Sequence, residues 1–334
     1  MSVRHTIAVL GGGRSSEHEI SLASARSVAG GLREAGHRVL DVEIGRDGVW
    51  RESGLELSLA PGRGWPGVDV VFPALHGPFG EDGTVQGLLE LLDVAYVGAG
   101  VLASAVCMDK VVFKELMSSA GIPQVEYRAL TAREWELDRT RVTGTIAELG
   151  LPVFVKPARL GSSVGIARVA EMSELAVALG QAFTHDPLVI VEAAAPGIEV
   201  ECSVLGNDDP IVSEPGEILL AAGEAAWYDY EAKYTPGAMQ LVVPARISGL
   251  ARERVQTLAV EAFTRAGCAG LARADFFVDG DTVLVNELNT MPGFTQTSVY
   301  GKLFDASGIS YVELLERLVG LARDRHIRER GYRY

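Results

Sequence analysis

Residues 272–293 read ARADFFVDGDTVLVNELNTMPG, and this stretch determines how the second half of the chain folds. Two runs rich in apolar residues, Ala272–Val278 and Thr282–Leu288, flank the turn residues Asp279-Gly280-Asp281. Short β-prone runs on either side of a glycine-containing turn are typical of a β-hairpin. The stretch therefore predicts two antiparallel strands followed by a loop at Thr290–Gly293.

Polar side chains recur at every second position of this hairpin. Arg273 and Asp275 lie two apart in the first strand, and Glu287 and Asn289 lie two apart at the end of the second. Because successive side chains of a strand point to opposite faces, each pair shares one face. A three-residue turn would place Arg273 opposite Glu287 and Asp275 opposite Val285, which brings all four polar residues onto the same face.

This polar face combines carboxylate and amide oxygens with an arginine. Such oxygens suit Mg²⁺, which takes carboxylates together with phosphate oxygens, and an arginine beside them can hold an anion bidentately. A surface salt bridge across the hairpin would explain Arg273 with Glu287, but it leaves Asp275 and Asn289 unexplained. The pattern therefore favours a site for a metal ion and phosphate.

A loop rich in glycine and serine lies upstream, between two short apolar runs. Val153–Val155 leads into Lys156, and Leu160–Gly165 reads LGSSVG. The backbone N–H groups of such a loop and the hydroxyls of Ser162 and Ser163 can lie over phosphates, and Lys156 adds a positive charge. The loop is not a Walker A motif, because no Gly-Lys-Ser/Thr follows it. A hairpin of small residues is the alternative, but the lysine and the acidic cluster favour phosphate binding.

The chain begins with the pattern of a strand, a glycine turn and a helix. Ile7–Leu10 precedes Gly11–Ser16, and Glu43 lies near the end of the next strand, which is close to a dinucleotide-binding fingerprint. The third glycine is missing, and Glu17 and Glu19 would repel a pyrophosphate at the helix N-terminus. A carboxylate there suits an ammonium group; helix capping without a ligand and a nicotinamide cofactor are the alternatives.

Apolar runs and helical patterns alternate over roughly the first hundred residues, which predicts a parallel α/β layer. The predicted elements there are strands at Val39–Ile44, Val68–Pro73 and Ala95–Val97, a helix at Thr84–Leu92 and a loop at Gly45–Gly67. Beyond it we expect helices at Asp109–Ala120, at Met172–Phe183 and from about Ser310, and strands at Pro152–Pro157, Gly165–Val169 and Val189–Glu192.

Composition narrows the classes of partner. The 334 residues carry a formal net charge of -14, which argues against nucleic acid or an anionic membrane as the main partner. The three cysteines are far apart and lack metal-ligand spacing, as expected for a reduced cytosolic protein. We find no secretion signal and no apolar run of about 18 residues. The chain is therefore expected to be cytoplasmic.

Taken together, these motifs resemble the D-alanine–D-alanine ligases of the ATP-grasp superfamily. The matching segments lie in the family's order over nearly the whole chain: Gly11–Leu22, Ala74–Leu89, Ser104–Lys110, Val155–Gly165, Tyr228–Tyr234, Gly267–Asp275 and Asn286–Thr295. The resemblance implies an N-terminal parallel α/β (Rossmann-like) domain and two α+β lobes that enclose ATP. We expect these three domains at residues 1–108, 109–205 and 206–334.

The resemblance also implies the reaction and its cofactor. Members of this family join two D-alanines through an acyl phosphate, using ATP, to supply D-alanyl-D-alanine for peptidoglycan precursors. Asp275, Glu287 and Asn289 match the metal ligands, which hold Mg²⁺ or Mn²⁺, with two ions expected. The family suggests a homodimer. A ligase that takes D-serine or D-lactate as its second substrate is the alternative within the family.

The resemblance assigns substrate contacts to five residues. Glu17 matches the glutamate that orients the ammonium of the first D-alanine, and His76 matches a histidine near the same site. Arg273 matches the arginine that stabilises the reacting centre, and Gly293 offers a backbone N–H near the acyl oxygen. Ser298 matches the serine that receives the carboxylate of the second substrate, although the preceding residues depart from the Ser-His-Ser of some relatives.

Nucleotide contacts follow in the same way. Lys110 and Lys156 match the lysines that contact the ATP phosphates, while Glu192 and Glu199 match the adenine-side and ribose-side glutamates. Asn286, within the matching segment Asn286–Thr295, is expected at the nucleotide site. Three alanines follow Glu192 where relatives often carry a lysine or a bulky side chain, so the adenine contact is expected to rest on backbone groups and apolar packing.

Two loops are expected to close over the site. Ser162 matches the loop serine, with Ser163 beside it, and Tyr234 matches the tyrosine to which that serine bonds on closure. Lys233 matches its basic neighbour. The Lys-Tyr pair is typical of dipeptide-forming relatives, so the sequence favours D-alanine as the acceptor.

Overall fold

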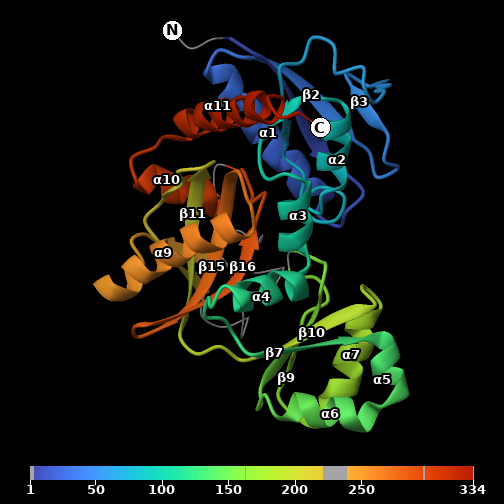
Figure 1. Ribbon diagram of the computed structural model, residues 1–334, viewed down its shortest axis with the longest axis vertical. Coiled ribbons are helices and arrows are strands. Elements are labelled where there is room, and N and C mark those ends of the chain that lie inside the picture. Colours follow the sequence, from blue (N-terminus) through green and yellow to red (C-terminus); the bar gives the residue numbers. More distant parts are fainter. Residues whose placement is uncertain (1–3, 162, 221–238, 296–297, 334) are drawn as a thin grey trace.

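The computed structural model describes residues 4–161, 163–220, 239–295 and 298–333. Three β-sheets form its framework, each covered by helices (Figure 1). The expected combination of a parallel α/β layer with two α+β lobes is confirmed, and the sheets of both lobes are antiparallel. Among the described residues, no helix has the length and apolar character needed to span a membrane.

The N-terminal sheet is parallel in its centre. Its strands, in spatial order, are β4 (Leu55–Glu56), β3 (Trp50–Glu52), β2 (Arg38–Ile44), β1 (Thr6–Gly12), β5 (Val70–Pro73) and β6 (Ala95–Tyr96). The pairs β1–β2, β1–β5 and β5–β6 are parallel, whereas β3 and β4 add an antiparallel edge. The stretch 45–67, expected as a loop, therefore contains two short strands.

Helices from both ends of the chain cover this sheet. On one face α1 (His18–Glu34) lies beside α11 (Tyr311–Glu329), and their leucines and valines share a core with Ile7 and Val9 of β1 (Figure 1). On the other face α2 (Thr84–Leu91) contributes Val85 and Leu89 to a second core. The C-terminal helix is thus part of the N-terminal layer.

The second sheet is small and antiparallel. Its strands, in spatial order, are β7 (Tyr127–Thr131), β10 (Leu188–Ala193), β8 (Val153–Pro157) and β9 (Ala167–Val169). One face is covered by α5 (Ala132–Leu137), α6 (Arg139–Ala147), the short helix η1 (Met172–Glu174) and α7 (Leu175–Phe183). On the other face Ile190 packs against Val111, while Phe154, Lys156 and Glu192 line a cavity.

The third sheet carries the predicted hairpin. Its strands, in spatial order, are β14 (Met239–Val242), β13 (Gly216–Leu220), β11 (Ile198–Gly206), β15 (Gly270–Asp279) and β16 (Thr282–Asn289), with β12 (Ile211–Val212) paired to β11. The helices α3 (Val101–Met108), α4 (Lys110–Ser119), α9 (Gly249–Arg265) and α10 (Val299–Ala306) pack around it. The expected domain limit at 205/206 falls inside β11, and the domain limits remain a prediction.

The hairpin register differs from the predicted one. Asp279 pairs with Thr282, so the turn has two residues and not three, and Asp275 lies opposite Glu287 while Arg273 lies opposite Asn289. A β-bulge beside Asp275 makes up the difference, because Asn286 is the extra residue of β16. The four polar residues still share one face, as predicted, but the bulge places them there and not a longer turn.

Candidate active site

Two neighbouring cavities lie on the polar face of the third sheet. The first, of about 440 Å³, lies between the second and third sheets. The second, of about 410 Å³, lies between the third sheet and the start of α1. Gly161 and Glu287 line both cavities, so the two spaces adjoin at the glycine- and serine-rich loop and the hairpin.

The first cavity collects most of the expected nucleotide contacts. It is lined by Lys110, Lys156, Ser163, Glu192, Glu199, Asn286 and Glu287. The bulge explains why Asn286 and Glu287, although adjacent in sequence, both reach this space. Ala193 and Ala195 also line it, beside Phe154 and Ile198, which fits the apolar surface expected where relatives carry larger residues.

Glu192 is held between two lysines at the floor of this cavity. Its carboxylate oxygens lie 3.0 Å from Lys114 Nζ and 2.5 Å from Lys156 Nζ. Burial alone would raise the pKa of Glu192, but the charges of Lys114 and Lys156 outweigh it and lower the pKa to about 2. Burial disfavours the charge on Lys156, yet Glu192 raises the pKa of that lysine overall. Glu192 and Lys156 therefore both stay charged beside the loop.

Lys110 joins the loop to the hairpin. It begins α4, where the Asp109 side chain accepts from the N–H groups of Val111 and Val112 and so fixes the helix start. Its ammonium donates to the Leu160 carbonyl at 2.7 Å and lies 3.7 Å from Glu287 Oε2. A phosphate beside the loop would meet this ammonium.

The hairpin brings Arg273, Asp275 and Asn289 into direct contact. Arg273 Nε and Nη2 donate to the two oxygens of Asp275, both at 2.7 Å, and Asn289 Nδ2 donates to Asp275 Oδ2 at 2.9 Å. Because the Asn289 amide nitrogen faces Asp275, its amide oxygen is the atom that could face a cation. Asp275 pairs directly with Glu287 in the ladder, so all three expected metal ligands lie at adjacent positions on one face.

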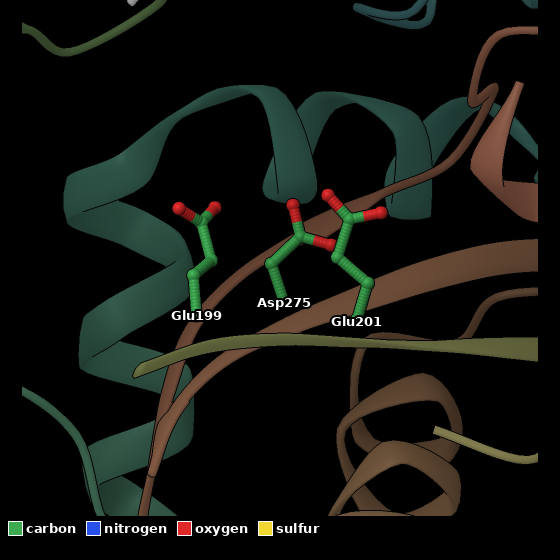
Figure 2. A group of neighbouring side chains, drawn as sticks. All are labelled: Glu199, Glu201 and Asp275. Atoms are coloured by element: carbon green, nitrogen blue, oxygen red, sulfur yellow. The ribbon is translucent and has the colours of Figure 1, made fainter. Parts of the chain in front are cut away.

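A second group of carboxylates extends this oxygen-rich surface. Glu199 and Glu201 of β11 and Asp275 of β15 point the same way from neighbouring strands, with oxygens within 4.8 Å of one another (Figure 2). Carboxylate oxygens at this spacing are the chemistry that Mg²⁺ or Mn²⁺ requires. The residues therefore fit a divalent cation.

The second cavity contains the expected substrate contacts. Glu17, His76, Arg273, Gly293 and Ser298 line it. Gly293 and Ser298 adjoin, because a Cβ on Gly293 would lie 2.9 Å from Ser298 Oγ. The Ser298 hydroxyl also accepts from the Thr295 N–H at 3.0 Å. The structure thus gathers five residues from three distant parts of the sequence.

Glu17 does not cap the helix that it precedes. Its side chain forms no capping hydrogen bond to α1, and it is buried against the glycine- and serine-rich loop, where a Cβ on Gly161 would lie 3.2 Å from Glu17 Oε2. Capping therefore does not explain this carboxylate. A buried carboxylate facing a cavity suits a cationic group of a ligand.

His76 is fixed by hydrogen bonds on both ring nitrogens. Nδ1 donates to the Met291 carbonyl at 3.0 Å, so Nε2 accepts, at 2.9 Å, from the Ser24 hydroxyl. Burial lowers the pKa of His76, which keeps the ring neutral. The same Ser24 oxygen accepts from the Phe294 N–H at 3.2 Å. His76 therefore positions the loop that carries Gly293.

Three charged residues near the two cavities are not predicted from the sequence. Lys114 lies one helical turn after Lys110, and Glu201 lies two residues after Glu199 in the same strand, so spacing could have indicated both. The third is Glu81, which lines the second cavity and accepts from the Gly77 N–H at 2.6 Å. Burial and the charge of Glu17 raise the pKa of Glu81 to about 8.

Some expected site residues lie outside the described residues. They are Ser162, Lys233 and Tyr234, together with the rest of the stretch 228–234 and the pair 296–297. Their assigned roles, and the preference for D-alanine that rests on Lys233 and Tyr234, stay predictions.

Comparison with known protein families covers most of the chain. The family model described as D-ala D-ala ligase C-terminus matches residues 116–320, and the one described as D-ala D-ala ligase N-terminus matches residues 6–63 and 58–99. A D-alanine–D-alanine ligase of Deinococcus radiodurans is 48% identical over 96% of this chain and 99% of that protein. One from Geobacillus thermodenitrificans is 43% identical over 96% of both chains.

Solved structures agree with these matches. The D-alanine–D-alanine ligase of Coxiella burnetii superposes with a TM-score of 0.86 at 36% identity, covering 98% of this chain and 96% of that one. The VanG D-Ala:D-Ser ligase of Enterococcus faecalis gives a TM-score of 0.83 at 36% identity, covering 96% and 100%. These matches favour a ligase loop at Gly11–Ser16 over the alternative of a nicotinamide-binding loop. With its fold, its two adjoining cavities and these matches, the chain belongs to the D-alanine–D-alanine ligase family.

Proposed function

We propose that this chain joins two D-alanines to D-alanyl-D-alanine, using ATP and an acyl-phosphate intermediate. The observation that carries this proposal is the meeting of the two cavities at Gly161 and Glu287. A phosphoryl group leaving a nucleotide in the first cavity would need to travel only across this junction to reach a carboxylate in the second. Binding the two reactants side by side converts a bimolecular step into an effectively unimolecular one.

The first cavity supplies the charge that a triphosphate needs. Lys110 and Lys156 line this cavity together with Leu160 and Gly161 of the loop, and Glu192 pairs with Lys156. Asp275, Glu287 and Asn289 would hold the divalent cation, whose charge offsets that of the transferring phosphoryl group. The loop residues Ser162 and Ser163 and the second loop at Lys233 and Tyr234 would then cover the nucleotide and exclude water from the acyl phosphate.

The second cavity supplies the groups for the amino acids. Glu17 would hold the ammonium of the first D-alanine by charge, and Ser298 would bond the carboxylate of the second. Arg273 and Gly293 line the same cavity, where the guanidinium and the Gly293 N–H would stabilise the oxyanion that forms when the second amine attacks. The chain thus contributes position and charge, with no covalent step on the protein.

A D-serine acceptor is the second candidate. It is favoured by the VanG D-Ala:D-Ser ligase, which is as similar in sequence as the Coxiella burnetii enzyme. The test is phosphate release from ATP and Mg²⁺ with D-alanine alone, with D-alanine plus D-serine, and with D-alanine plus D-lactate. Release with D-alanine alone, unchanged by the other acceptors, supports the first proposal. Release only when D-serine or D-lactate is added would overturn it.

The cellular setting follows from the reaction. The proposed reaction consumes ATP and supplies D-alanyl-D-alanine for peptidoglycan precursors, and so for the shape of the cell wall. We therefore propose that the chain works in the cytoplasm, where ATP is available. We also propose a homodimer, as the family suggests, with no nucleic-acid or membrane partner. Light scattering of the purified chain tests this, with a mass near twice 35.6 kDa expected.

A further inference from the structure

Glu201 is a buried carboxylate that forms an ion pair with Arg273. It lies on β11 opposite Asp275, and it is fully buried, with 0% of its surface exposed. Its Oε2 lies 2.9 Å from Arg273 Nε. Figure 2 shows Glu201 and Asp275 pointing in the same direction from adjacent strands. A fully buried carboxylate requires a charged partner, and Arg273 fills that role.

Arg273 is shared between these two carboxylates in an unequal way. Its Nε and Nη2 donate to the two oxygens of Asp275, both at 2.7 Å. Nε carries a single hydrogen, and that hydrogen points at Asp275. The Nε–H therefore donates its hydrogen bond to Asp275. Glu201 lies at hydrogen-bond distance from the same nitrogen but attracts it by charge alone.

This pairing conflicts with the role proposed for Asp275. Both oxygens of Asp275 accept from Arg273, and Oδ2 also accepts from Asn289. A divalent cation needs carboxylate lone pairs that point at it, and it repels a guanidinium bonded to the same oxygens. Arg273 must therefore loosen from Asp275 before the cation can bind there.

We propose that Glu201 is a positioning residue that accepts the Arg273 Nε–H hydrogen bond when a divalent cation binds Asp275. The Nε–H turns from Asp275 to Glu201 across a distance that is already 2.9 Å, so the guanidinium keeps a charged partner throughout. Arg273 lines the second cavity, so its remaining N–H groups would be available to a substrate there. Cation binding at Asp275 and the hydrogen bonding of the Arg273 guanidinium beside the substrate cavity are thereby coupled. This inference rests on the metal site of the proposed function.

The first test measures metal affinity and not activity. Mn²⁺ is titrated into the full-length wild-type chain and into Glu201→Gln, and the electron paramagnetic resonance signal of free Mn²⁺ is recorded. The variant should fold, because Arg273 keeps its bonds to Asp275. Without the Glu201 charge, Arg273 stays on Asp275, so Mn²⁺ should bind about three to ten times more weakly, as for coupled neighbouring charges.

Asp186→Asn is the matched control. Asp186 is also buried and paired with an arginine, accepting from Arg159 Nε at 2.9 Å, but it lies outside both cavities. The Mn²⁺ affinity of this variant should equal that of the wild type. Equal affinity in Glu201→Gln as well would overturn the proposal. If the wild type binds no Mn²⁺, the metal site itself fails, and the inference fails with it.

A crystal structure of the wild type with Mn²⁺ and ADP gives the second test and needs no variant. We expect the Mn²⁺ on Asp275, with Arg273 Nε bonded to Glu201 and no longer to Asp275. Mn²⁺ coordinated by Glu201 itself would contradict the positioning role. So would Mn²⁺ on Asp275 with both Arg273 bonds to Asp275 unchanged.

Discussion

At the scale of single residues, Arg273 makes two kinds of contact that can be tested separately. It faces the second cavity, and it balances the buried charge of Glu201 at 2.9 Å. A lysine at this position would keep the charge but lose the planar fork that reaches two oxygens at once. Removing the charge altogether would leave Glu201 buried without this cation.

Arg273→Lys and Arg273→Ala should therefore differ in stability but not in activity. Both should lower turnover by about 10²–10³, the usual effect of losing one oxyanion donor. Only Arg273→Ala should also destabilise the fold, by about 3–5 kcal/mol, because it breaks a buried ion pair. Urea unfolding and phosphate release measure the two effects. Equal stability of the two variants would show that Glu201 does not depend on the arginine charge.

Glu81 should make the free energy of unfolding fall as pH rises. Its pKa is about 8 in the folded chain against a usual value of 4.5, so the folded state holds a proton that the unfolded state has released between these values. The free energy of unfolding should therefore fall as pH rises from 5 to 8, by at most about 1.4 kcal/mol per pH unit.

Glu81→Gln should remove this loss. The variant should gain stability over the wild type as pH rises from 5 to 8 in urea unfolding, whereas the exposed Glu253→Gln should follow the wild type at every pH. A constant difference between Glu81→Gln and the wild type would contradict the raised pKa.

Single residues are predictable where they belong to a short motif. The spacing of Arg273, Asp275, Glu287 and Asn289 is enough to indicate that the four share a face. Glu81 escapes such reasoning because its raised pKa depends on burial and on Glu17, 64 positions earlier in the sequence. Such contacts arise from packing and leave no local pattern.

At the scale of elements, one serine joins helix α1 to the loop after β16. Ser24 is fully buried; it donates to His76 Nε2 and accepts from the Phe294 N–H. His76 in turn donates to the Met291 carbonyl. The loop that carries Gly293 is therefore fixed to the N-terminal layer by two hydrogen bonds, and the bond between Ser24 and His76 holds their partners in place.

Ser24→Ala should loosen this loop at little cost in volume. It leaves the Phe294 N–H and His76 Nε2 without that partner, which costs about 1–3 kcal/mol per buried group. We expect a lower free energy of unfolding and a higher KM for D-alanine, with the KM for ATP nearly unchanged. Ser119→Ala, whose exposed hydroxyl bonds only within its own helix, is the control. An unchanged KM for D-alanine would argue against the positioning role.

The strands of the β15–β16 hairpin are predictable from the sequence, but their register is not. Its two strands are predictable, but the turn expected between them is one residue too long. The cue for the bulge is the spacing of the buried residues Val283, Val285 and Leu288, which are two and then three apart. A strand whose apolar spacing changes from two to three must bulge to keep burying one face.

At the scale of the whole molecule, the two ends of the chain are packed together. Gly31 of α1 is buried against α11, and a Cβ there would lie 2.5 Å from Leu315 Cδ1 and 3.1 Å from Tyr311 Cε1. Its neighbour Gly30 is exposed and meets nothing within 4 Å. Sequence alone could not predict that the last helix would cover the first sheet, because the pairing is set by long-range burial.

Alanine at these two adjacent glycines should have opposite effects. Gly31→Ala should destabilise the chain by about 1–3 kcal/mol, because the added methyl overpacks the contact between α1 and α11. Gly30→Ala should stabilise it by about 0.5–1 kcal/mol, because alanine is the better helix former. Urea unfolding of the two variants decides, and effects of the same sign would contradict this packing of the C-terminal helix.

The central claim is that the two adjoining cavities form one ligase site. Its most direct test is mass spectrometry of the product made from ATP, Mg²⁺ and D-alanine, alongside a count of the ADP and phosphate released. We predict one D-alanyl-D-alanine for each ADP and each phosphate with the wild type, and none with Glu287→Gln. ATP hydrolysis without dipeptide, or equal dipeptide from Glu287→Gln, would contradict the account.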